Sequence, residues 1–161
     1  MHKLRVGVIR GGPSTEYDVS LKTGQSVLAH LPTDKYIGRD IFIDRSGTWH
    51  VRGMSVEPGR AIEQVDVIFN ALHGAYGEDG GVQRVLDTYR IPYTGSGALG
   101  SSISMNKVLT KHALRGVDMR FAPHLEIRRA HCSEETVRGV FHKLNPPYVV
   151  KPRDGGSSSG A

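Results

Sequence analysis

Two predominantly apolar runs stand out in the chain, residues 4–9 and 65–72, and each is followed by a glycine-rich segment. Short apolar runs bounded by turn residues predict buried strands. Residues 37–43 alternate between apolar and polar positions, which predicts a further strand. We also expect a small hairpin at residues 45–51 and a brief strand at residues 91–93.

Helical spacing follows both buried runs. After Ser20, the apolar residues recur at roughly helical intervals until Pro32, and a second helix is expected from about Asp79 to Tyr89. Strands that alternate with helices predict parallel βαβ units, in which functional groups gather at the carboxyl ends of the strands. We therefore expect the segments 11–16, 73–80 and 93–97 to meet at one edge of a parallel sheet.

The pattern changes after about residue 105. Helices are expected at residues 106–115 and 133–144, the second capped by Ser133, and strands at residues 121–127 and 148–151. We interpret residues 1–98 as a complete α/β domain and residues 99–161 as the first, incomplete part of a second domain.

Composition narrows the functional classes. No run approaches the roughly 20 apolar residues of a membrane span, and the amino terminus lacks a secretory signal, so we expect a cytoplasmic protein without a membrane partner. Cys132 is the only cysteine, which excludes an internal disulfide and a thiolate metal cluster. The net charge of +5 comes from residues 99–161, with 10 Lys and Arg against 5 Asp and Glu. Because no basic run interleaved with aromatics accompanies it, we expect no nucleic-acid partner.

Two loops offer groups for a small ligand. The segment 11–16 ends in Glu16, whose carboxylate could hold a substrate ammonium, and it is not the Gly-x-Gly-x-x-Gly of dinucleotide-binding proteins. His73 ends the second apolar run and opens a segment with three glycines. An ordinary glycine turn with a surface glutamate, and a packed structural histidine, are the alternatives.

A lysine and a Gly/Ser loop suggest a phosphate site near the carboxyl end of the sequence. Lys151 precedes the run Gly-Gly-Ser-Ser-Ser-Gly at residues 155–160, so the order differs from that of a P-loop. Lys107 is a second candidate cation. The backbone and hydroxyl donors of the loop, including Ser157 and Ser158, could cover phosphate oxygens. The alternative is a flexible linker, which has the same composition.

Taken together, the motifs resemble, in order and over the whole chain, those of D-alanine–D-alanine ligases. Each motif alone is weak, but five in sequence are specific to this family. The motifs are Gly-Gly-Pro-Ser-Thr-Glu-Tyr-Asp-Val-Ser at 11–20, His-Gly-Ala-Tyr-Gly-Glu-Asp-Gly at 73–80, Pro-Tyr-Thr-Gly-Ser-Gly at 92–97, Ser-Met-Asn-Lys at 104–107, and Val-Lys-Pro at 150–152 with Gly-Ser-Ser-Ser-Gly at 156–160.

The resemblance implies a Rossmann-like pre-ATP-grasp domain, followed by the first part of an ATP-grasp domain. It implies an ATP- and Mg²⁺-dependent enzyme of peptidoglycan precursor synthesis, acting as a homodimer, that joins two D-alanine molecules through an acyl phosphate. Glu16 would bind the ammonium of the first D-alanine in a network with Ser157, and His73 would lie near that substrate's carboxylate. Lys107, Lys151 and Ser158 would contact the nucleotide.

The sequence departs from this family at two positions. Arg10 stands where an apolar residue is usual, which puts local packing in doubt, and Asn106 replaces a common Asp. The family's magnesium ligands and nucleotide-base contacts lie beyond residue 161, so we expect the 161 residues alone to be inactive. A D-alanine–D-lactate or D-alanine–D-serine ligase, and a non-catalytic truncated module, remain the alternatives.

Overall fold

The computed structural model describes residues 2–156. Its internal contacts divide the chain into two compact units, Met1–Ser102 and Ile103–Ala161. Each unit has its own architecture and is described separately.

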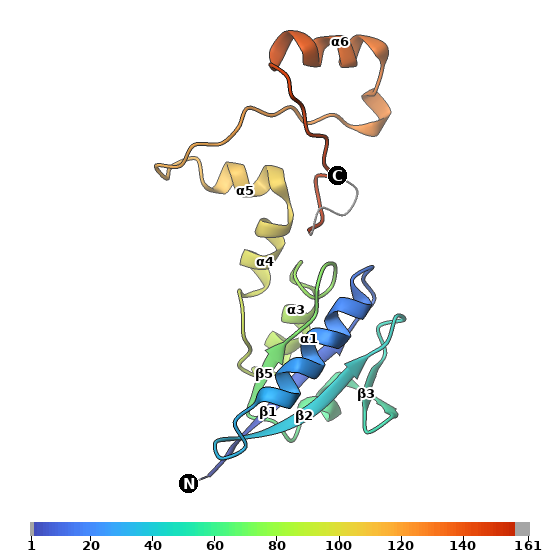
Figure 1. The fold of residues 1–161 in the computed structure, drawn as a ribbon, viewed down its shortest axis with the longest axis vertical. Coiled ribbons are helices and arrows are strands. Elements are labelled where there is room, and N and C mark those ends of the chain that lie inside the picture. Colours follow the sequence, from blue (N-terminus) through green and yellow to red (C-terminus); the bar gives the residue numbers. More distant parts are fainter. Residues whose placement is uncertain (1, 157–161) are drawn as a thin grey trace. The chain divides into compact units, whose positions relative to one another are not determined.

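The first unit is built on a five-stranded sheet with the order β4-β3-β2-β1-β5 (Figure 1). The central strand β1 (Leu4–Gly11) pairs in parallel with β2 (Tyr36–Ile43) on one side and with β5 (Val67–Asn70) on the other. Strands β3 (Trp49–Val51) and β4 (Met54–Val56) extend the sheet in antiparallel fashion. The predicted parallel α/β architecture is confirmed.

Helices cover both faces of this sheet. Helix α1 (Tyr17–His30) packs on one face over a small cluster that includes the buried Val6 and Val8. Helices α2 (Pro58–Ile62) and α3 (Gly81–Thr88) pack on the opposite face. The larger core lies there, because successive side chains of a strand point to opposite faces. Its buried members are Ile9, Ile41, Ile43, Trp49, Ala61, Ile62, Val65, Ile68, Leu72, Val82 and Leu86.

Differences from the expected elements in this unit concern short segments. The run 65–72 contributes a strand of only four residues, and of residues 91–93 only Tyr93 forms a bridge, in parallel with Ile68. The turn at residues 45–47 joins β2 to β3 as expected, whereas β4 and α2 were not expected. These two elements are three and five residues long, which is too short to show a periodic pattern.

The regular elements described in the second unit are helices, joined by long irregular segments. Helix α4 (Ala98–Met105) spans the boundary, where the sequence predicted a glycine-rich connection over its first residues. Helices α5 (Lys107–Ala113) and α6 (Glu134–Lys143) occupy the two predicted helical stretches, and a 3₁₀ turn forms at Arg129–His131. The predicted Ser133 cap is confirmed, since its hydroxyl accepts from the backbone N–H of Thr136 at 3.2 Å.

The strands predicted at residues 121–127 and 148–151 are wrong, because both segments are extended or irregular. A strand requires a neighbour that accepts and donates its backbone hydrogen bonds. Within residues 103–156 the structure supplies only an isolated bridge between Asn106 and Asp154. Apolar side chains of these segments, such as Val149 and Val150 at 74% and 84% exposure, stay in contact with solvent.

No helix within residues 2–156 is both long and apolar enough to cross a membrane.

Arg10, which raised doubt about local packing, is accommodated by its neighbours. Its guanidinium donates two hydrogen bonds of 2.7 Å to the two carboxylate oxygens of Asp40 on β2. Its methylene groups fill the space beside Gly24 of α1, where an added Cβ would lie 2.5 Å from the Cβ of Arg10. The apolar stem thus packs under the helix while the charged fork reaches the neighbouring strand.

Gly24→Ala should therefore destabilise the first unit by about 1–3 kcal/mol through overpacking, although alanine usually stabilises a helix. The matched control is Gly139→Ala in α6, because an added Cβ there meets no atom within 4 Å. We expect that substitution to stabilise α6 by about 0.5–1 kcal/mol. Hydrogen exchange in the two units would measure both effects, and equal effects of the two substitutions would contradict the packing described.

Arg5 and Asp66 fasten the amino ends of β1 and β5. The carboxylate of Asp66 accepts from the guanidinium of Arg5 at 2.6 Å and from the Arg5 backbone N–H at 2.7 Å. These hydrogen bonds lower the pKa of Asp66 from 3.8 to about 2. Since the folded pKa lies below the unfolded one, the pair contributes stability above pH 3.8 and loses it as the pH falls through 2.

Asp66→Asn should lower the free energy of unfolding at neutral pH, because the substitution removes the ionised carboxylate. The difference from the parent protein should shrink as the pH falls from 3.8 towards 2, where the parent carboxyl also becomes neutral. Urea unfolding at a series of pH values measures this difference. Arg5→Gln should lose the same pH-dependent component, and a difference that stays constant throughout would show that the pair does not act through ionisation.

Candidate functional site

Two loops meet at the carboxyl ends of the neighbouring strands β1 and β5 (Figure 1). The first, residues 11–16, leads from β1 into α1, and the second, residues 73–80, leads from β5 into α3. The hydroxyl of Ser14, which is 7% exposed, donates to the backbone oxygen of His73 at 2.6 Å. The predicted approach of these two segments is therefore confirmed.

A buried serine fixes the point at which α1 leaves these loops. The hydroxyl of Ser20 accepts from the backbone N–H of Gly11 at 2.8 Å and donates to the backbone oxygen of Ala71 at 2.8 Å. Ser20 has no exposed surface. Buried backbone groups at both strand ends are thereby satisfied by one side chain of the helix.

Glu16 occupies the amino-terminal cap position of α1, beside the second loop. Its backbone N–H donates to the Ser14 hydroxyl at 3.1 Å. A Cβ on Gly74 would lie 3.2 Å from Oε1 of Glu16, and Gly74 has a φ of 71°. Glycine is the residue that accepts this conformation without strain and lets the two loops approach so closely. Within residues 2–156 no side chain forms an ion pair with the Glu16 carboxylate.

His73 is held from two sides. Its Nε2 lies 2.9 Å from the hydroxyl of Thr23 on α1, and its Nδ1 lies 3.9 Å from a carboxylate oxygen of Glu78. The other carboxylate oxygen of Glu78 accepts from the backbone N–H of Gly74 at 2.7 Å. A carboxylate opposite Nδ1 favours a proton on that nitrogen, so neutral His73 would accept the Thr23 hydrogen at Nε2.

Ser14, Thr23 and Glu78 therefore belong to the candidate site, although sequence reasoning did not select them. Glu16, Ser20 and Thr23 are spaced by four and three residues, which places their side chains along one face of a helix. This polar stripe, directed at a glycine-rich segment, was the available signal. The contact with Ser14 depends on strand pairing and had no comparable local signal.

A third loop completes this edge of the sheet at the end of β2. One carboxylate oxygen of Asp44 accepts from the backbone N–H groups of Ser46 and Thr48, and the other lies 2.9 Å from Nε2 of His50. Hydrogen bonds from Ser46 and His50 hold the pKa of Asp44 well below its usual range. The turn carries Arg45, whose guanidinium lies 4.1 Å from the centre of a ring on α1, that of Tyr17.

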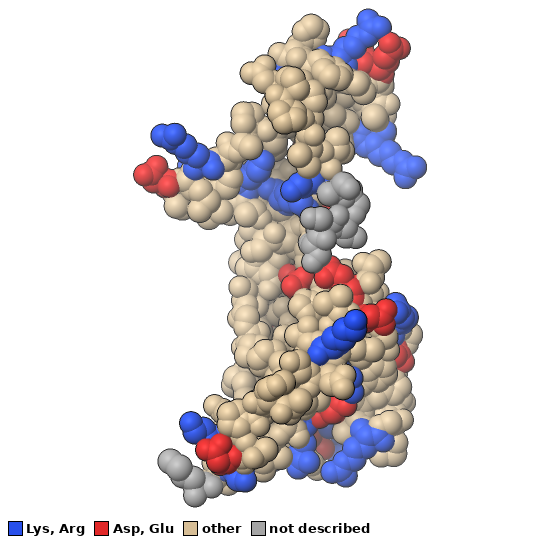
Figure 2. All heavy atoms as spheres, in the orientation of Figure 1, with Lys and Arg blue, Asp and Glu red and all other residues tan. Residues whose placement is uncertain are grey.

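Acidic side chains gather at the end of the first unit where these loops lie (Figure 2). The loops and the start of α1 contain Glu16, Asp18, Glu78 and Asp79. The carboxylate of Asp79 is used locally, because it accepts from the backbone N–H groups of Tyr76 and Gly81. With Glu78 directed to Gly74 and His73, Glu16 is the carboxylate best placed to receive a cationic group.

The predicted phosphate-binding lysines lie in the second unit. Lys107 is partly buried, and its ammonium donates to the backbone oxygen of Gly155 at 2.7 Å. The backbone N–H of Lys107 also donates to the backbone oxygen of Arg153 at 3.0 Å, so the segment after Lys151 lies beside the start of α5. Lys151 itself is exposed. The proposed roles of both lysines stay predictions, and Ser157 and Ser158 lie outside the described residues.

Asn106 links these parts of the second unit. Its side-chain oxygen caps α5 by accepting from the backbone N–H groups of Val108 and Leu109 at 3.1 and 2.9 Å. Its amide nitrogen donates to a carboxylate oxygen of Asp154 at 2.7 Å. The common Asp could form the cap, but it would have no hydrogen to donate to Asp154.

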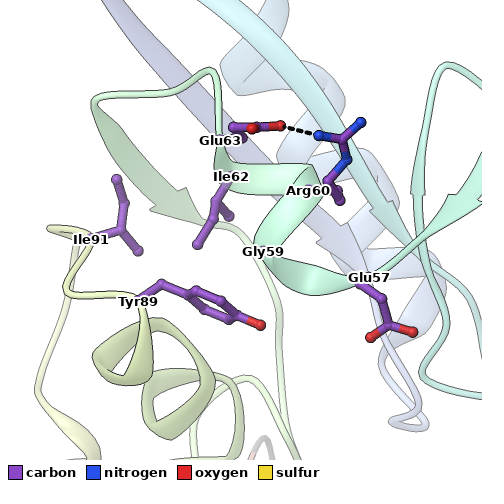
Figure 3. Close-up of a pocket in the computed structure, with 7 residues that line it drawn as sticks. All are labelled: Glu57, Gly59, Arg60, Ile62, Glu63, Tyr89 and Ile91. Atoms are coloured by element: carbon purple, nitrogen blue, oxygen red, sulfur yellow. Dashed lines mark hydrogen bonds and ion pairs between the residues drawn. The ribbon is translucent and has the colours of Figure 1, made fainter.

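The first unit also has two hollows outside the loops that carry Glu16 and His73. One, of about 420 Å³, is lined by α2 and the end of α3, with Tyr89 and Ile62 inside it and Arg60 paired with Glu63 at its rim (Figure 3). The other, of about 570 Å³, is lined by β2, the hairpin of β3 and β4, and α2. Neither hollow is lined by Glu16 or His73, so the candidate site is an open edge of the sheet. Residues 2–156 contain no group of three or more His, Cys, Asp or Glu arranged to hold a metal ion.

Comparison with known proteins gives the chain a family. The profile of the family described as D-ala D-ala ligase N-terminus matches residues 5–61 and 52–96. The D-alanine–D-alanine ligase of Solibacter usitatus is 38% identical over 158 residues, which cover 98% of this chain and 47% of the relative. D-alanine–D-alanine ligase A of Escherichia coli is 31% identical and is matched over 53% of its length by 99% of this chain. The chain thus spans about half the length of the curated relatives it matches.

Solved structures agree with this relationship. The D-alanine–D-alanine ligase of Bacillus anthracis superimposes with a TM-score of 0.77 at 37% identity, covering 98% of this chain and 48% of that one. The VanG D-Ala:D-Ser ligase of Enterococcus faecalis gives a TM-score of 0.78 at 26% identity, covering 98% of this chain and 54% of that one. On the strength of the profile match, the chain belongs to the D-alanine–D-alanine ligase family, whose amino-terminal region it contains.

Proposed function

We propose that the chain provides the first D-alanine site and part of the nucleotide site of an ATP-dependent D-alanine–D-alanine ligase. The observation that carries this proposal is the meeting of Glu16 and His73 in two neighbouring loops of a chain that belongs to this family. One loop offers a carboxylate without an ion-pair partner in the described residues. The other offers an imidazole that is oriented by one hydrogen bond, with Thr23, and by the nearby carboxylate of Glu78.

The proposed reaction proceeds in two steps. A carboxylate oxygen of the first D-alanine attacks the γ-phosphorus of ATP, and ADP leaves, which produces an acyl phosphate. The amine of the second D-alanine then attacks the acyl carbon, loses a proton, and expels inorganic phosphate as the amide bond forms. Both steps concentrate negative charge, so cationic and N–H donors around the phosphoryl group would lower the barrier.

The residues of the first unit would position the first D-alanine. We assign the substrate ammonium to Glu16, because a charged hydrogen bond in this open edge would fix the amino end of the molecule. His73 would lie near the substrate carboxylate, with Thr23 and Glu78 orienting its ring. Ser157 would join Glu16 in a hydrogen-bonded network.

The second unit would contact the nucleotide. Lys107 and Lys151 are assigned to the phosphates of ATP, and Ser158 would contribute a hydroxyl donor to them. The magnesium ligands are proposed to lie in the part of a ligase of the relatives' length that this chain does not span. We further propose that the enzyme acts as a homodimer in the cytoplasm, in peptidoglycan precursor synthesis.

A D-alanine–D-serine ligase is a second candidate function. It is compatible with the TM-score of 0.78 with the VanG D-Ala:D-Ser ligase. The two activities would share the site for the first D-alanine and differ in the nucleophile of the second step. Product analysis with D-alanine alone, with added D-serine and with added D-lactate would distinguish them and would also detect a D-alanine–D-lactate ligase.

Glu16→Gln should lower kcat/KM for the first D-alanine. The expected decrease corresponds to about 1.5–3 kcal/mol, the usual contribution of a charged hydrogen bond. The measurement is the rate of phosphate release as a function of D-alanine concentration, in the complete ligase that contains this sequence. The melting temperature should hardly change, because the carboxylate has no ion pair to lose within the described residues. Glu57→Gln, an exposed carboxylate just before α2, provides the matched control.

Two outcomes would count against the assignment of Glu16. A variant that unfolds at a lower temperature but retains full activity while folded would indicate a structural role. A loss of activity equal to that of Glu57→Gln would show that the carboxylate does not contact the substrate.

A further inference from the structure

The hollow of about 570 Å³ on the first unit contains an arginine that the fold does not explain. Arg39 lies on β2 and is spaced two residues from Ile41, so its side chain leaves the sheet on the same face as the larger core. Its Nε is buried and has no hydrogen-bond partner among the described residues. An arginine side chain stays charged at any physiological pH, so this donor cannot be neutralised by losing its proton.

Two further arginines line the same hollow from neighbouring elements. Arg52 lies in the turn between β3 and β4, with a φ of 53°, and forms no ion pair with another described residue. Arg60 comes from α2 and donates to Glu63 at 2.9 Å (Figure 3). Strand β2, the turn between β3 and β4, and helix α2 thus each contribute one arginine to the lining of this hollow.

The acidic residues that line the hollow are already occupied. Both oxygens of Asp40 accept from Arg10 at 2.7 Å on the opposite face of the sheet, and one oxygen of Glu63 accepts from Arg60. Arg39 and Arg52 therefore keep their charges without a counter-ion from residues 2–156. A buried donor of this kind is usually satisfied in native proteins by another residue, by an ordered water or by a bound group.

We propose that this hollow binds a small organic anion, whose carboxylate or phosphate group is held by Arg39 and Arg52. The planar fork of guanidinium donors suits the oxygens of such groups. Apolar side chains line the same cavity, among them Val56 and the exposed Met54, and they would contact the body of the ligand. The site is separate from Glu16 and His73, so its occupant is distinct from the D-alanine and ATP of the proposed reaction.

The test is a titration of the isotopically labelled full chain with inorganic phosphate and with phenyl phosphate, at an ionic strength kept constant with chloride. We expect saturable changes in the amide resonances of Arg39 and Arg52 with both probes. Phenyl phosphate should bind more tightly than inorganic phosphate, because its ring can contact the apolar lining. Phosphate bound near Lys107 and Lys151 would shift a different set of resonances and so is distinguished by position.

Two variants and one control make the result specific. Arg39→Met should weaken binding about tenfold or more, because a charged hydrogen bond is lost, and it should fold, since it removes a buried donor that has no partner among the described residues. Arg52→Gln should weaken binding while leaving the buried side chain unchanged. Arg128→Gln removes an exposed guanidinium in the second unit and should have no effect.

Absence of saturable changes at Arg39 and Arg52 with both probes would overturn the proposal. Equal affinity of the parent protein, Arg39→Met and Arg52→Gln would overturn it as well. Because the readout is local binding and requires no catalysis, these results are independent of whether the chain takes part in D-alanine ligation.

Discussion

The buried hydroxyl of Ser20 fixes the sheet edge at which the loops with Glu16 and His73 lie. Parallel strands end at the same side of a sheet, and their last backbone groups need partners that the sheet itself no longer provides. Ser20 satisfies one such group on Gly11 and one on Ala71, so α1 can start at only one place relative to both strands. Glu16, four residues earlier, and Thr23, three residues later, inherit their positions from this contact.

This arrangement explains why the two loops can act together. Glycine at position 74 lets the second loop pass close to the Glu16 carboxylate, while Ser14 binds the backbone of the same loop. Thr23 and Glu78 then restrict the imidazole of His73 from opposite sides. The resulting edge carries oriented polar groups before any ligand arrives, which reduces the entropy lost on binding.

Long elements of the first unit were predictable because each carries its own periodic signal. The runs at residues 4–9 and 37–43 and the helix after Ser20 correspond to β1, β2 and α1. The same reasoning failed at residues 121–127 and 148–151, where an apolar pattern has no neighbouring strand within the described residues. An apolar strand pattern indicates which residues could form a strand. Whether they do depends on a neighbouring strand that accepts and donates their backbone hydrogen bonds.

The residues of the candidate site also fall into two groups, those predictable from local patterns and those that depend on contacts distant in sequence. Glu16 and His73 stand at the ends of predicted elements, so their approach followed from the order of strands and helices. The hydroxyl groups of Ser14 and Thr23 gained their significance only from contacts across 59 and 50 residues of sequence. Arg39 had no such signal, because nothing in the pattern of residues 37–43 distinguishes an arginine whose Nε is buried.

The side chain of Asn106 has a consequence for how this chain can change over evolutionary time. Its side-chain oxygen accepts a hydrogen bond at the start of α5, and its side-chain nitrogen donates one to Asp154. Both ends of the amide are therefore in use. Aspartate would keep the first contact and turn the second into a repulsion between carboxylates. Positions 106 and 154 are therefore coupled: a lineage that acquires aspartate at the first is expected to lose the acid at the second, and the two substitutions should appear together in descendants.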